Sequence, residues 1–99
     1  MNLTLMTDKE ILTLIAQRAK DVRISNNLRQ KDLSKNSEVP LSSIRVFERS
    51  GVISFVYLIK LLRTLGIIEE LDCLFKKEEI TDLQSAIAEV NVSRKRVRK

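Results

Sequence analysis

The stretch from Leu28 to Gly51, LRQKDLSKNSEVPLSSIRVFERSG, constrains the fold of this chain more than any other segment. Its apolar residues have the spacing of two short helices that cross through a turn of about three or four residues. Pro40 suits the first turn of the second helix, where its missing amide hydrogen is not needed, and Gly51 suits the stop of that helix. We expect the two helices over about 30–36 and 40–49.

The side chains inside this unit agree with the prediction at most positions. Ser34 is small where the first helix must approach the second closely. The turn position where glycine is common holds Glu38, which we expect to adopt a left-handed conformation at a cost of ~1 kcal/mol. An ordinary helical bundle with a similar pattern by chance is the alternative. The apolar positions of the unit are Leu33, Val39, Ile44 and Phe47.

A longer helix is expected before this unit. Thr7 and Glu10 match a capping box, in which the two side chains satisfy free amides at the start of a helix. Asn26 and Asn27 mark its end, because asparagine tolerates the left-handed conformation needed there. Its expected buried stripe is Ile11, Leu14, Ile15, Ala19 and Val22.

Further helices are expected after the unit. Ser54 is a plausible cap and Gly66 a stop for a helix with the stripe Phe55, Leu58, Ile59, Leu62 and Leu65. Another helix is expected from about Ile68 to Phe75, with Leu71, Leu74 and Phe75 facing inward. A short sixth helix is possible over about 81–90, and residues 91–99 show no periodicity. No strand pattern persists, so the predicted fold class is all-α.

Length and composition limit the fold and the function of this chain. Its 99 residues are enough for one domain. A single cysteine, Cys73, cannot form an intramolecular disulfide, which favours a reducing compartment. Because histidine is absent, metal sites and histidine-based acid–base chemistry lose their commonest residue. Cys73 lies in a helix expected to be buried and has no histidine to activate it, and no pair of carboxylates has an informative spacing. We therefore expect no metal site, no cofactor and no enzyme activity. No apolar run approaches the ~20 residues that span a bilayer, and no signal peptide pattern is present, so a cytoplasmic protein is expected.

Charge is distributed unevenly along the chain. Residues 18–49 carry eight basic and four acidic side chains, whereas residues 66–92 carry two basic and seven acidic ones. Solvated helix faces are the plain explanation, but one basic face with an acidic segment behind it also suits a polyanionic partner. Residues 94–99 form a tail that we expect to be disordered in the free protein. Its five basic residues are Arg94, Lys95, Arg96, Arg98 and Lys99.

Residues 14–72, about 60% of the chain, resemble the lambda-repressor-like, or XRE-type, helix-turn-helix domain. That resemblance implies a five-helix DNA-binding domain over residues 7–75, with the helix-turn-helix unit at 30–49. Residues 76–99 would be a C-terminal extension with a possible short helix and the basic tail. The resemblance is carried by Arg23, Leu28, Gln30, Leu33, Val39, Ile44, Glu48, Gly51, Leu58, Leu62 and the Leu65–Gly66 pair.

The resemblance also implies structural roles. Arg23 and Glu48 would form a buried salt bridge that orients the second helix of the unit, with little net effect on stability. Gln30 would hold a backbone phosphate at the start of the first helix, together with the free amides there. The usual serine or threonine cap before that helix is replaced by Arg29, which leaves its capping open.

The second helix of the unit would face the major groove of DNA. Arg45 can donate two hydrogen bonds to guanine, and Leu41 can pack on a thymine methyl group. The alternatives are that Arg45 is a plain surface arginine and that Leu41 is buried. Ser42 and Ser43 can bond to bases or phosphates. Residues expected to contact phosphate and set the register are Arg29, Lys31 and Arg49.

The segments SSIRVFERSG, LRTLG and LDCLF, followed by an acidic link and the basic tail, resemble the HipB-like antitoxins of HipA-type serine/threonine kinase toxins. This resemblance implies a bacterial, nucleoid-associated homodimer that binds a palindromic operator, represses its own operon and neutralises the kinase. A helix-turn-helix regulator of a phage or restriction system, without a toxin partner, is the alternative. A helical protein-interaction module is a third possibility.

We expect the dimer interface to lie within residues 67–90, because this segment contains more apolar residues than a small core needs. They are Ile67, Ile80, Leu83, Ile87 and Val90. The basic tail has two possible partners, DNA phosphate or an acidic surface of a toxin, and nonspecific DNA contact is the simpler expectation.

Overall fold

The longest helix, α1 (Asp8–Ser25), begins where the capping box predicts. In the computed structural model, which describes residues 2–77, the Thr7 hydroxyl accepts a hydrogen bond from the Glu10 amide at 3.1 Å. The Glu10 carboxylate accepts one from the Thr7 amide at 2.9 Å. A short 3-10 helix, η1 (Leu3–Leu5), precedes α1, and Asn27 after it is left-handed with a φ of 59°.

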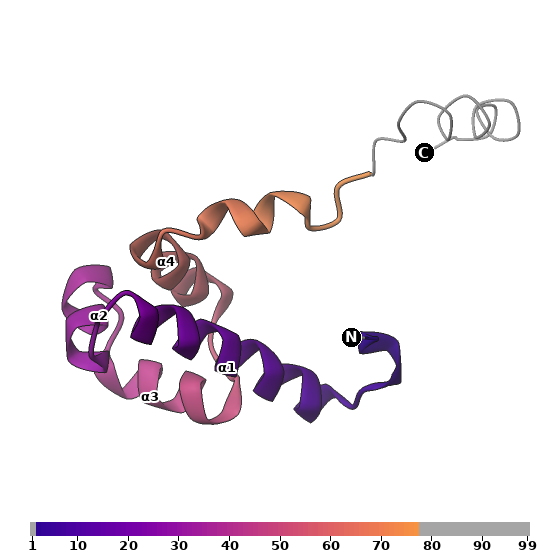
Figure 1. Ribbon diagram of the computed structural model, residues 1–99, viewed down its shortest axis with the longest axis horizontal. Coiled ribbons are helices and arrows are strands. Elements are labelled where there is room, and N and C mark those ends of the chain that lie inside the picture. The colour runs from indigo at the N-terminus through magenta and orange to yellow at the C-terminus, as the bar shows by residue number, and fades with distance from the viewer. Residues whose placement is uncertain (1, 78–99) are drawn as a thin grey trace, which may run out of the picture.

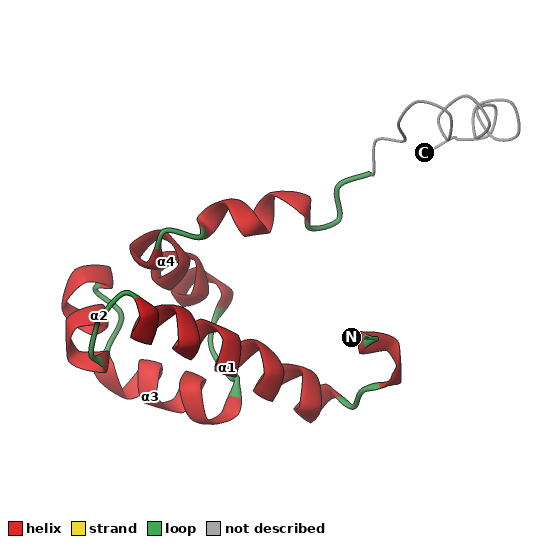
Figure 2. Cartoon of the chain, viewed as in Figure 1, coloured by secondary structure: helices red, strands yellow, loops and turns green. Residues whose placement is uncertain are grey.

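The chain continues through α2 (Gln30–Ser37), α3 (Leu41–Ser50), α4 (Phe55–Leu65) and the 3-10 helix η2 (Ile68–Cys73). Figure 1 shows α1 and α3 side by side, with α2 at one end of the pair, and α2 also contacts α4. All regular structure within residues 2–77 is helical (Figure 2), so the predicted all-α class is confirmed for this part of the chain. None of its helices is long and apolar enough to cross a membrane.

The turn between α2 and α3 is built by serine side chains and one left-handed residue. Glu38 has a φ of 66° and a ψ of 21°, as expected for the position where glycine is common. Its amide donates to the carbonyl of Ser34 at 2.8 Å, and the Ser34 hydroxyl donates to the Val39 carbonyl at 2.6 Å. These bonds close the turn on its own backbone, which explains how a residue with a Cβ is tolerated there.

One core holds the helices together. The four predicted residues of the α2–α3 unit are all buried, and two of them, Val39 and Ile44, have no exposed surface. The core consists of Ala16, Leu33, Val39, Ile44, Phe47, Leu61 and Leu65, with Leu62 at its edge.

The predicted buried stripes of α1 and α4 are confirmed in part, since Leu62 and Leu65 are buried and Ala19, Val22 and Leu58 pack against the core, but two assignments differ. On α1, Ile15 is exposed and Ala16 is buried; on α4, Phe55 is exposed and Leu61 is buried. Both helices are apolar enough that more than one stripe fits the helical period, so packing against the neighbouring helices decides which residues face inward. The inward assignments of Ile15 and Phe55 were therefore wrong.

The end of the described chain also differs from the expectation. Residues Ile68–Cys73 form a 3-10 helix, and the side chains of Leu74 and Phe75 are exposed rather than inward-facing. Cys73, expected in a buried helix, is exposed as well. Among the described helices this segment contacts chiefly α4, and a short 3-10 run has weaker hydrogen-bond geometry than an α-helix. The possible sixth helix and the basic tail lie outside the described residues.

Gly51 and Gly66 end α3 and α4 with the same left-handed backbone but in different surroundings. Gly51 has a φ of 84°, and a Cβ on it would lie 2.5 Å from both the backbone oxygen and the Cβ of Leu12. Gly66 has a φ of 78°, and a Cβ there would meet nothing within 4 Å. Only Gly51 therefore sets how closely α1 approaches the end of α3.

We expect the Gly51→Ala substitution to lower the free energy of unfolding by about 2–4 kcal/mol, because left-handed strain adds to a backbone collision. Gly66→Ala is the matched control. It should lower the free energy of unfolding by about 1 kcal/mol, from the left-handed backbone strain alone. Urea denaturation followed by circular dichroism measures both. Equal losses in the two variants would contradict a close approach of α1 at Gly51.

Candidate nucleic-acid interface

The carboxylate of Glu48 joins three helices. It accepts hydrogen bonds from the Nε of Arg23 at 2.7 Å and from its Nη2 at 2.9 Å, which gives the paired geometry of a guanidinium and a carboxylate. The Arg23 side chain is 10% exposed and that of Glu48 is 5% exposed. The third nitrogen of Arg23 donates to the Leu28 carbonyl at 2.8 Å. The implied salt bridge is thus present, and it also ties down the loop before α2.

Gln30, the first residue of α2, is part of the same cluster. Its side-chain nitrogen donates to Glu48 at 2.9 Å, on the oxygen that also accepts from Arg23. The position of Gln30 was expected to hold a backbone phosphate, which stays a prediction. What the structure describes is an internal contact that fixes the start of α2 against α3.

The capping of α2 is settled by Asp32. Its carboxylate accepts hydrogen bonds from the Arg29 backbone amide at 2.9 Å and from the Arg29 guanidinium at 3.1 Å. The guanidinium bond first, and then the backbone bond, lower the pKa of Asp32 to about 2. The same pair raises the pKa of Arg29, whose side chain remains 74% exposed. Arg29 is therefore partly neutralised at the point where it was expected to meet phosphate.

The outward face of α3 presents most of the residues expected to read DNA. Ser42, Arg45 and Arg49 are exposed, while Leu41 and Ser43 are half-buried. Ile44 and Phe47 on the opposite face are buried in the core. Lys31 on α2 is exposed.

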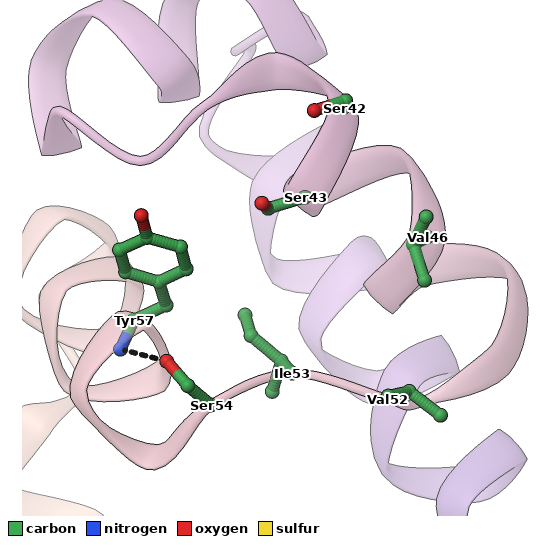
Figure 3. Close-up of a pocket in the computed structure, with 7 residues that line it drawn as sticks. All are labelled: Ser42, Ser43, Val46, Val52, Ile53, Ser54 and Tyr57. Atoms are coloured by element: carbon green, nitrogen blue, oxygen red, sulfur yellow. Dashed lines mark hydrogen bonds between the residues drawn. The ribbon is translucent and has the colours of Figure 1, made fainter.

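A hollow of about 290 Å³ lies between α3 and the start of α4 (Figure 3). Figure 3 shows Val46 and Val52 at one end of it and the ring of Tyr57 at the other. The Ser54 hydroxyl, which caps α4, accepts from the Tyr57 amide at 3.1 Å. The hollow is lined by Ser42, Ser43, Val46, Val52, Ile53, Ser54 and Tyr57.

Apart from Glu48, which is buried against Arg23, the charged side chains of α3 and α4 are all basic. Between residues 39 and 68 the sequence has four basic residues and one acidic residue. The acidic residue is Glu48, and its carboxylate is buried against Arg23. The remaining charges are Arg45, Arg49, Lys60 and Arg63. This surface therefore attracts anions without an opposing carboxylate from its own helices.

Val46 was not among the residues expected at this interface. It is exposed on α3 and lines the hollow. Its position four residues after Ser42 places it on the same helix face, so helical spacing could have identified it. No sequence signal pointed to the bond between Gln30 and Glu48. Within residues 2–77, no three histidine, cysteine, aspartate or glutamate side chains gather where they could hold a metal ion.

Comparison of the chain with models of known protein families gives no match, and comparison with curated proteins finds no significant relative.

We expect the Glu48→Gln substitution to lower the free energy of unfolding by about 3–5 kcal/mol, because it leaves the Arg23 guanidinium buried without a counter-charge. Asp72→Asn is the matched control: it makes the same chemical change in an exposed pair with Lys76, and should cost at most about 0.5 kcal/mol. Chemical denaturation measures both. A loss at Glu48 no larger than that at Asp72 would show that the cluster does not hold the three helices.

Proposed function

We propose that this chain is a sequence-specific DNA-binding repressor of the lambda-repressor-like helix-turn-helix class, in which α3 enters the major groove. The observation that supports this proposal most is the α3 face, where Ser42, Arg45 and Arg49 are exposed and the one carboxylate of the helix, Glu48, is buried against Arg23. Arginine can donate two hydrogen bonds to guanine in the major groove, and serine can bond to bases or phosphates. The sequence resemblance described above supports the same class.

The way α3 is held against its neighbouring helices supports the geometry that this function needs. A reading helix must project from the domain while staying rigidly held, because misplacement by an ångström loses its hydrogen bonds. Here α3 is fixed on its inner face by Ile44 and Phe47 and at its end by Glu48. Gln30 ties the start of α2 to the same carboxylate.

We propose that the protein acts as a homodimer on a palindromic operator. One helix-turn-helix unit makes few base contacts, so two half-sites about one helical turn apart are the usual solution. Of the five apolar residues expected at this interface, Ile67 lies within the described residues, and it packs against the core instead of being left over. The exposed side chains of Leu74 and Phe75 still offer apolar surface within the expected interval 67–90. The rest of that interval lies outside the described residues.

We also propose that the protein is the antitoxin of a HipA-like kinase, which rests on the sequence resemblance alone. A phage or restriction regulator without a toxin remains the alternative function. In both cases the DNA chemistry of α3 is the same, so the two must be separated by their partners rather than by the operator.

We expect the Arg45→Ala variant to bind the preferred DNA site about 1–3 kcal/mol more weakly, roughly five- to 150-fold, because it loses a two-pronged contact to a base. The site is first selected from a random duplex library by the full-length protein, and affinity is measured by fluorescence anisotropy at fixed salt. Arg18→Ala, which removes an exposed arginine of α1 outside the proposed interface, is the control and should change affinity far less. Unchanged binding by Arg45→Ala would mean that α3 is not the reading helix.

Truncation after Ser93 should weaken DNA binding and flatten its salt dependence while the preferred sequence stays the same. The deletion removes five positive charges, each of which can contribute about −0.9 to the log–log salt slope if it neutralises a phosphate. Affinity at several salt concentrations measures the slope. An unchanged slope would remove the tail from DNA binding and favour its docking on a protein partner.

The antitoxin proposal predicts a stable complex with the HipA-like kinase whose gene neighbours that of this chain. Co-expression followed by size-exclusion chromatography should give one complex, and kinase autophosphorylation should fall when the complex forms. If no such gene is adjacent, or if the two proteins elute separately, the chain is a regulator without a toxin partner.

A further inference from the structure

Val46 is an exposed apolar residue on the face of α3 that otherwise carries polar and basic side chains. It is 38% exposed, follows Ser42 by four residues and stands next to Arg45. Val52, 58% exposed, lines the same end of the hollow (Figure 3). A single exposed valine is common on protein surfaces. This one is unusual in its position, because it lies among groups suited to hydrogen bonding with an anionic partner.

The chemistry of valine limits what it can recognise in DNA. Its side chain neither donates nor accepts hydrogen bonds, so it is indifferent to the donors and acceptors on base edges. The apolar group that the major groove offers is the C5-methyl group of thymine. A β-branched side chain on a helix has one strongly preferred rotamer, so its two methyl groups are held in place before DNA binds.

Leu41 was the residue expected to meet a thymine methyl, and Val46 is a second apolar residue of α3 that can do so. Leu41 is half-buried at the start of α3, whereas Val46 is exposed in the middle of the helix. Arg45 beside it can bond to the neighbouring base pair, so the two side chains can read adjacent positions.

We propose that Val46 is a specificity-determining residue that packs against the C5-methyl group of a thymine in each operator half-site. This inference rests on the proposed function, because it requires α3 to lie in the major groove. It deepens that function by naming a base that the site must contain.

The experiment removes one methyl group from the DNA and two from the protein. In the duplex site selected by the full-length protein, each thymine is replaced in turn by deoxyuridine, which differs from it by that methyl group alone. Wild type, Val46→Ala, Leu41→Ala and Val56→Ala are titrated with every duplex. Val56 is the matched control because it is an exposed valine of α4, 62% exposed. Circular dichroism checks that each variant is folded.

For the wild type and for Val56→Ala, we expect replacement of the contacted thymine in one half-site to weaken binding about fourfold, the effect of burying one methyl group. For Val46→Ala, the same replacement should have no effect, because the methyl group has lost its partner. A sensitivity to deoxyuridine that persists in Val46→Ala but disappears in Leu41→Ala would overturn the proposal in favour of Leu41. Insensitivity of the wild type at every thymine would overturn it as well.

These outcomes are distinguishable from failure of the proposed function. If the selection yields no preferred sequence, the chain is not a sequence-specific DNA-binding protein, and both proposals fail. If a preferred sequence emerges and Arg45→Ala weakens binding to it, the proposed function stands. If deoxyuridine at every thymine then leaves the affinity unchanged, only the proposal for Val46 fails.

Discussion

The buried carboxylate of Glu48 is the constraint on which the arrangement of the helices depends. It lies on α3 and binds Arg23 of α1 and Gln30 of α2, so one side chain fixes three helices relative to one another. Arg23 extends the cluster to the Leu28 carbonyl in the loop between α1 and α2. A buried ion pair adds little net stability, because the cost of removing two charges from water offsets their attraction. Its contribution is better described as orientation, because burying either charge without its partner is strongly unfavourable and packings of α3 that separate the pair are therefore disfavoured.

The same cluster shapes the surface as well as the interior. Because Glu48 is the single acidic residue between positions 39 and 68, its burial leaves Arg45 and Arg49 without a nearby carboxylate on α3 or α4. The surface of α2 differs, since Asp32 both caps that helix and pairs with Arg29. The basic side chains of α3, the helix proposed to read DNA, and of α4 are therefore not opposed by a free carboxylate on the same two helices, and residues 94–99 add five basic residues to the sequence.

Local signals made parts of this structure predictable from the sequence. The capping box at Thr7, the left-handed Glu38 and the helix stop at Gly51 each depend on a few neighbouring residues, and each is observed. The errors fall where longer-range packing decides. Ile15 and Ala16 both fit an apolar stripe, and the neighbours of α1 determine that Ala16 is the buried one. The prediction that Phe55 faces inward failed for the same reason, whereas Phe75 lies beyond the end of the 3-10 helix η2 and is fully exposed. The bond between Gln30 and Glu48 joins residues that no local pattern connects.

The central claim, that the Glu48 cluster holds α3 as a DNA-reading helix, is tested most directly by nuclear magnetic resonance. The ¹⁵N-labelled full-length protein is titrated with its selected duplex, and amide shifts are followed along the chain. We expect the largest changes over residues 41–49 and at the start of α2, with little change in the amides of η1 and of the first turn of α1. Changes concentrated in η1, α1 or η2, with α3 unaffected, would contradict the claim.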